Sequence, residues 1–180
     1  MHIIDISHLD SEQARAELQS IADSNKNIAC QIDFWADHTQ SKIIRDFVGY
    51  IFDKYNIDTV WRGRFVLITD ELVNNAIEHG STAWDLDSCI IRAHENENKD
   101  FSITLEVHDT GKGKDSKDAT HMEEIKNQKL EEHNAQWVHM EKRGRGLFYI
   151  TERLVDRLSF DESIKGWLAV RVEKNIPMTK

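Results

Sequence analysis

The sequence predicts an α+β protein, a two-layer sandwich in which a mixed, mostly antiparallel sheet is covered on one face by about three helices. Two observations lead to this prediction. Segments with alternating apolar residues, typical of strands, occur as two adjacent pairs in the second half of the chain. Segments with apolar residues three and four apart, typical of amphipathic helices, are grouped between the strands. Grouped strands with segregated helices favour this architecture over an alternating α/β fold.

The individual elements follow from these two patterns. Five segments have the pattern of strands, and they lie at 28–35, 88–95, 101–109, 158–162 and 166–174. Three segments have the pattern of amphipathic helices, and they lie at 38–55, 60–79 and 147–157. The second of these helices is expected to end at Gly80. A long polar stretch at 114–142 contains no glycine or proline and is expected to be partly helical.

Length and composition bound the domain organisation. A chain of 180 residues is long enough for one domain with a proper core. We expect a polar helical appendage at 1–27 and one main domain at 28–180. Uninterrupted apolar runs are short, as in FVLI at 65–68, and the N-terminal segment lacks the pattern of a signal peptide. The sequence therefore predicts a cytoplasmic protein that does not associate with a membrane.

Charge and residue counts argue against several classes of function. The net charge is −9, whereas a nucleic-acid partner requires a basic surface, so direct nucleic-acid binding is not expected. Cys30 and Cys89 are the only cysteines and do not form a C-x-x-C pair, which argues against a disulfide framework and a cysteine zinc site. The histidines show no paired spacing of metal ligands, and no nucleophile-elbow pattern supports a hydrolase triad.

The segment ELVNNAIEHG, at 71–80, concentrates polar residues on one side of a predicted helix. On a helical wheel the apolar side is formed by Leu72, Val73, Ala76 and Ile77. The polar side is formed by Glu71, Asn74, Asn75, Glu78 and His79. For an isolated helix, a polar face that is simply solvated is the commoner explanation. Glu71 and Asn75, four residues apart, nevertheless lie one above the other and form a candidate site.

Glycines cluster in two further segments, VHDTGKGK at 107–114 and KRGRGLFYI at 142–150. The first follows a predicted strand and the second precedes a predicted helix. Alternating glycines allow positive φ and a close approach of the backbone to a ligand. The N-terminus of a helix suits phosphate, and Lys142, Arg143 and Arg145 add positive charge there. Either segment alone is weak support for nucleotide binding.

The three segments together resemble the conserved boxes of the GHKL group of ATP-binding domains, which includes gyrase and histidine kinases. E-x-x-x-N-A at 71–76 resembles the N box, D-x-G-x-G at 109–113 the G1 box, and G-x-G at 144–146 the G2 box. The resemblance extends over about 28–175. It is strongest to the anti-sigma-factor serine/threonine kinases, because DELVNNAIEHG, the preceding helix with Arg45 and the short hairpin between the N and G1 boxes are similar to theirs. No separate helix with a phosphoacceptor histidine, which a complete sensor histidine kinase would need, is visible in the sequence.

This resemblance implies a role for each motif residue. Glu71 would be the catalytic base, and Asn75 would bind ATP through Mg²⁺ as the protein ligand of the metal. Asp109 would accept a hydrogen bond from the adenine amino group, with Gly111 and Gly113 keeping the loop close to the base. The phosphates would be held by the G2 segment, which comprises Arg143, Gly144, Arg145, Gly146 and Leu147. The stretch 114–142 would be a lid over the nucleotide.

The implied function is that of an ATP- and Mg²⁺-dependent serine/threonine protein kinase that regulates transcription by partner switching. Its partners would be a STAS-type anti-sigma-factor antagonist and a sigma factor, and a homodimer is compatible with the resemblance. Two alternatives stay open: a nucleotide-gated binding module without kinase activity, and the catalytic domain of a histidine kinase system. The chain departs from the family pattern at Lys114, usually an apolar residue, and at Trp167, usually a threonine.

Overall fold

The computed structural model describes residues 1–133 and 154–178, and within helix α4 it describes no side chains beyond residue 128. The strands are β1 His2–Asp5, β2 Ile28–Trp35, β3 Leu86–Glu95, β4 Phe101–His108, β5 Arg157–Glu162 and β6 Leu168–Ile176. The helices are α1 Ser11–Ser24, α2 His38–Lys54, α3 Thr59–Asn75 and α4 Ala119–His133. A π-helical turn, η1 Ala76–Gly80, continues α3.

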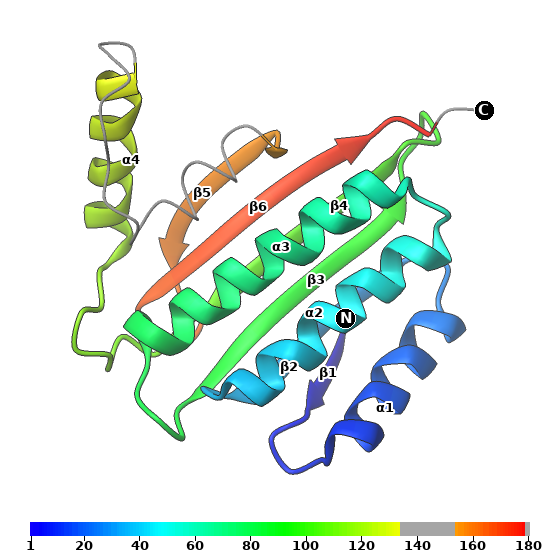
Figure 1. Cartoon of the computed structure of the whole chain (residues 1–180), viewed down its shortest axis with the longest axis horizontal. Coiled ribbons are helices and arrows are strands. Elements are labelled where there is room, and N and C mark those ends of the chain that lie inside the picture. The colour runs from blue at the N-terminus through cyan, green and yellow to red at the C-terminus, as the bar shows by residue number, and fades with distance from the viewer. Residues whose placement is uncertain (134–153, 179–180) are drawn as a thin grey trace.

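The strands form one sheet in the order β1-β2-β3-β4-β6-β5. The β1–β2 pair is parallel and the other four pairs are antiparallel. Helices α1, α2 and α3 lie side by side across one face of the sheet, whereas α4 stands at one end beside β5 (Figure 1). The predicted fold class, a mixed and mostly antiparallel sheet covered on one face, is confirmed.

The core lies between this helical layer and the sheet. In β4 the residues Phe101, Ile103, Leu105 and Val107 alternate toward the helices, and all four are buried. The Phe101 ring meets Phe52 of α2 edge to face at 5.2 Å between ring centroids, and Phe52 packs in turn against the tilted ring of Phe65 of α3 at the same separation. This aromatic contact fixes α2 and α3 on the strand that leads into the G1 box.

The N-terminal residues contribute a strand that the sequence did not predict. Residues 2–5 pair with β2, and the predicted helix follows as α1, which buries Ala14, Leu18 and Ala22 in the shared core. A four-residue edge strand carries too little alternation to be recognised from its own pattern. Residues 1–27 thus extend both layers of the main domain, while the domain boundary at residue 27 stays a prediction.

The second half of the chain is only partly described. Most of the predicted helix 147–157 lies outside the described residues. Leu154 is helical, but β5 begins at Arg157, so a helix end at 157 is wrong by about three residues. Leu158 and Phe160 alternate into the core, which favours a strand over a continued helix. In the polar stretch 114–142, α4 confirms the helical part, while its role as a lid stays a prediction.

Candidate active site

The N box occupies the C-terminal end of α3 and the turn that follows it. The predicted helix 60–79 is confirmed in extent, but its last turn is π-helical. A π-helical turn widens the backbone by one residue and is often found at functional sites. The α-helix thus ends at Asn75, the last residue of α3. Glu78 and His79 lie in the wider turn that follows.

The backbone of this turn meets the G1 box at Gly80. Gly80 is buried, and a Cβ added to it would overlap the carboxylate of Asp109. Gly80 is not among the positive-φ residues, so the sequence-based reason for this glycine, a helix stop, is incomplete. Its physical role is to let a carboxylate that lies 29 positions later in the chain approach the helix end.

The G1 box forms a tight loop at the end of β4. Asp109 is 5% exposed, and its Oδ1 accepts hydrogen bonds from the Gly111 N–H at 3.1 Å and the Leu168 N–H at 3.4 Å. Gly111 has φ +69, a conformation that glycine adopts without strain. The Gly113 N–H donates to the Gly80 carbonyl at 3.2 Å, and a Cβ on Gly113 would overlap the His79 carbonyl. The structure therefore joins the N and G1 boxes directly.

Glu71 and the two asparagines differ in their surroundings. Glu71 is partly buried, and burial, followed by the nearby charges of Asp70 and Glu78, raises the pKa of its carboxyl. The Oδ1 atom of Asn74 contacts His38 Nδ1 at 3.1 Å and accepts from Ser41 Oγ at 3.0 Å.

Asn74 therefore ties α3 to α2, a structural role that the sequence did not reveal. Asn75 makes no side-chain hydrogen bond within the part of the chain that the structure describes.

A polar network that the sequence analysis missed holds these segments together. Ser81 Oγ donates to Asp87 Oδ1 at 2.6 Å and accepts from the Thr110 N–H at 3.2 Å. Asp87 is fully buried and faces the core side of β3, in the same row as Cys89. A carboxylate at an inward position of an apolar strand is the signal that could have revealed it, but the predicted strand began one residue later, at Ser88.

Burial also changes the acidity of this network. Burial raises the pKa of Asp109 to about 6, against the opposing effect of the Leu168 and Gly111 N–H donors. Burial raises the pKa of Asp87 to about 7; the Ser81 hydrogen bond opposes this, and the negative charge of Asp109 adds to it. Both carboxyls therefore bind a proton in the folded chain at a pH where they have lost it in the unfolded chain.

We expect Asp87→Asn to make the folded state less sensitive to high pH. Between about pH 4 and 7 the folded chain holds a proton on Asp87 that the unfolded chain has released, so this group lowers the free energy of unfolding as pH rises. The difference in melting temperature, variant minus wild type, should therefore be more positive at pH 8 than at pH 5, as measured by circular dichroism. Asp161→Asn, at a half-exposed carboxylate of β5, is the control and should show no such trend. An unchanged difference at the two pH values would contradict the prediction.

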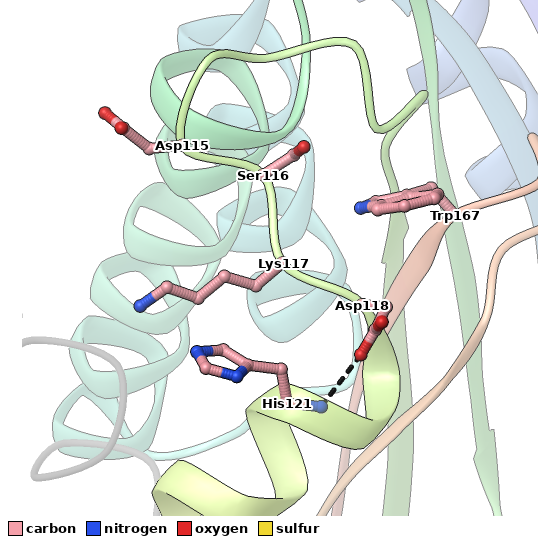
Figure 2. Close-up of a pocket in the computed structure, with 6 residues that line it drawn as sticks. All are labelled: Asp115, Ser116, Lys117, Asp118, His121 and Trp167. Carbon is pink, nitrogen blue, oxygen red and sulfur yellow. Dashed lines mark hydrogen bonds between the residues drawn. The ribbon is translucent and has the colours of Figure 1, made fainter.

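An open pocket of about 420 Å³ lies beside the G1 loop. Figure 2 shows Trp167 at one side of it, with the indole nitrogen turned toward the pocket, and Lys117 and His121 extending on the other side. The indole packs against Gly111, because a Cβ there would overlap the Trp167 ring. The residue that departs from the family pattern thus contacts the loop that carries Asp109.

The third motif is not tested. Arg143, Gly144, Arg145, Gly146 and Leu147 all lie outside the described residues, so their predicted contacts with phosphate stay predictions.

Cys30 and Cys89 are buried free thiols. Within residues 1–133 and 154–178, no group of three or more His, Cys, Asp or Glu side chains could hold a metal ion. In the same ranges, no helix has both the length and the apolar character needed to cross a bilayer.

An α+β sandwich that brings a helix with an E-x-x-x-N motif against a D-x-G-x-G loop defines a nucleotide-binding domain of the histidine kinase type. Residues 34–173 match the family described as histidine kinase-like ATPase domain, and the chain belongs to this family. The family is one of ATP-binding domains, and the match confirms the resemblance to the GHKL group.

Comparison with other proteins adds little to this assignment. A search of curated proteins finds no match. Among solved structures, the chain is similar to the histidine kinase domain of a blue-light-activated histidine kinase from Erythrobacter litoralis EL346. The two are 14% identical over 94% of this chain and 76% of the other, with a TM-score of 0.41.

Proposed function

We propose that this chain is a serine/threonine protein kinase of the anti-sigma-factor type, which transfers the γ-phosphoryl group of ATP to a protein hydroxyl. The observation that carries the proposal is the arrangement of Glu71 and Asn75. They lie one helical turn apart on α3, Glu71 has a raised pKa, and no hydrogen bond joins the Asn75 side chain to another described residue, whereas Asn74 bonds to Ser41. A binding module without chemistry has no need of a carboxylate in this position.

In the proposed reaction Glu71 is the general base. The serine oxygen forms a bond to the γ-phosphorus as the bond from that phosphorus to the β–γ bridging oxygen breaks, so ADP is the leaving group. The hydroxyl proton passes to the Glu71 carboxylate. A carboxyl whose pKa lies nearer the working pH is a better base than one with an ordinary pKa, provided that it is ionised. Burial and the charges of Asp70 and Glu78 supply this shift.

The residues present fit Mg²⁺ with a single protein ligand. Mg²⁺ prefers oxygen ligands and keeps most of its water, so one amide oxygen together with phosphate oxygens is sufficient. Asn75 would supply that oxygen, and the chemistry contributed by the bound metal is neutralisation of phosphate charge. At the other end of the nucleotide, Asp109 would recognise the adenine amino group from a buried position that the Gly111 and Leu168 N–H groups orient.

Partner switching is the proposed biological setting. The chain would hold a sigma factor until a STAS-type antagonist competes for it, and phosphorylation of the antagonist would end that competition. The net charge of −9 supports this proposal, because an acidic surface speeds encounter with a basic, DNA-binding partner.

The test combines binding and transfer. Isothermal titration with ATP should give heat that depends on Mg²⁺, and incubation with radiolabelled ATP and candidate antagonists should give acid-stable phosphoserine or phosphothreonine. Acid-labile phosphate on a partner histidine would instead identify a histidine kinase system. Tight partner binding that requires ATP, with no transfer, would identify a nucleotide-gated module. Absence of ATP binding at millimolar nucleotide would refute all three.

A further inference from the structure

Asp85, immediately before β3, is a shared acceptor between two segments that are distant in sequence. Its Oδ2 accepts from the Thr82 N–H at 2.8 Å, from Thr82 Oγ1 at 2.6 Å and from Thr110 Oγ1 at 3.1 Å. Its Oδ1 accepts from Lys112 Nζ at 2.7 Å. Thr82 follows the N-box turn, whereas Thr110 and Lys112 flank Gly111 in the G1 box.

We propose that Asp85 is a positioning residue that clamps the G1 loop to the end of the N-box helix and so sets the shape of the base-binding part of the ATP site. The proposal rests on the proposed function, because it assumes that the G1 loop receives the base. Asp85 itself needs no contact with the nucleotide. It acts through Thr110 and Lys112, which hold Gly111 between them.

Burial and charge make this clamp effective. The Asp85 side chain is 10% exposed, while that of Lys112 is 66% exposed. Burial alone would raise the pKa of Asp85, but the hydrogen bonds from Lys112 and Thr82 outweigh it and hold that pKa well below its ordinary value. The carboxylate is therefore ionised at neutral pH, and hydrogen bonds to an ionised acceptor are the stronger kind.

The residue before Asp85 has a strained backbone conformation, and it lies in the turn that orients the Asp85 carboxylate. Trp84 has φ +71, an unfavourable conformation for a bulky residue, although its side chain is 75% exposed. Strain of this kind persists where the surrounding contacts impose it. Here the Asp85 N–H donates to the Thr82 carbonyl at 3.0 Å, and this turn carries Trp84 while it aims the Asp85 carboxylate at both segments.

The experiment compares ATP with inorganic tripolyphosphate, which lacks the base. Asp85→Asn removes the ionised acceptor but keeps the size of the side chain. We expect ATP affinity to fall about tenfold or more, since hydrogen bonds to a charged group are the ones lost, while tripolyphosphate affinity with Mg²⁺ stays unchanged. Lys112→Met should weaken ATP binding in the same selective way, but by a smaller factor. In the double variant, the loss of ATP-binding free energy should be smaller than the sum of the losses in the two single variants.

Asp156→Asn is the matched control. Asp156, immediately before β5, accepts from Lys174 Nζ at 2.5 Å and from the Asn175 N–H at 2.7 Å, both on β6 rather than at the G1 loop. It should leave the affinities for both ligands unchanged. A general loss of folding would weaken tripolyphosphate and ATP alike, so an equal loss of both ligands in Asp85→Asn would overturn the positioning role, as would unchanged ATP affinity.

Amide hydrogen exchange without nucleotide separates this inference from the proposed function. The N–H groups of Gly111 and Gly113 are hydrogen bonded to Asp109 and Gly80, so they should exchange slowly in the wild type. Asp85→Asn should speed exchange at both, with the core strands unaffected. Unchanged exchange would overturn the clamp even if ATP binds. If wild type fails to bind ATP while exchange rises as expected, the proposed function fails and the clamp stands.

Discussion

Replacing Glu71 with glutamine should slow phosphoryl transfer to the antagonist by about 10²–10⁴-fold, the contribution of a general base to such a step. ATP and partner affinity should stay almost unchanged, because glutamine keeps the size of the side chain and its capacity for hydrogen bonding. The amide cannot accept the hydroxyl proton, so only the chemical step is affected. Single-turnover transfer from radiolabelled ATP, measured beside equilibrium titration, separates the two effects.

The control for this variant is Glu78→Gln. Glu78 lies in the π-helical turn, its side chain is 54% exposed, and it contacts His38 at 4.0 Å. It contributes to the raised pKa of Glu71, so its removal should shift the pH dependence of transfer toward lower pH without a large loss of maximal rate. Transfer at the wild-type rate in Glu71→Gln would show that Glu71 is not the base. Loss of ATP binding in that variant would assign Glu71 a structural or metal-linked role instead.

Replacing Asn75 with alanine should abolish Mg²⁺-dependent ATP binding and leave the fold intact. The side chain lies on the polar face of α3 and takes no part in hydrogen bonds within the described residues, so its removal costs little stability. Loss of the protein ligand should weaken Mg-ATP binding by at least about 100-fold, since even indirect partners of a metal contribute 10–100-fold. Titration with ATP in the presence and absence of Mg²⁺ measures the effect.

The neighbouring asparagine provides the matched control. Asn74→Ala removes the acceptor for Ser41, a residue that is 2% exposed, and leaves a buried hydroxyl without this partner. This variant should lower the melting temperature, because an unsatisfied buried group costs roughly 1–3 kcal/mol. It should retain Mg²⁺-dependent ATP binding. The opposite result, with binding lost in Asn74→Ala and kept in Asn75→Ala, would exchange the roles assigned to the two residues.

The Trp167 side chain lies against the G1 loop, at the end of the proposed ATP site that would bind the base. It stands where the family pattern has a threonine, and it packs on Gly111 beside the buried carboxylate of Asp109. The sequence showed that this position departs from the pattern. Its contact with the G1 loop became visible only when β6 was placed next to β4, because Leu168 pairs with Asp109 across the sheet.

The amino-acid sequence by itself determined the elements that depend on local periodicity. The apolar residues that alternate in β4, and those spaced three and four apart in α2, are buried in the core. The motif spacing was likewise sufficient to predict the ATP-binding family. A short element such as β1 could not be predicted, because four residues do not establish a pattern.

Only the tertiary structure decided which residues the N and G1 boxes contact. Which of Asn74 and Asn75 packs against α2 depends on where Ser41 lies, and the helical wheel places both on the same side. The reason for Gly80 is the approach of Asp109, and the clamp at Asp85 joins residues 25–27 positions apart. Such contacts depend on how strands and helices are placed against one another. A short stretch of sequence does not specify which distant residue will contact it after folding.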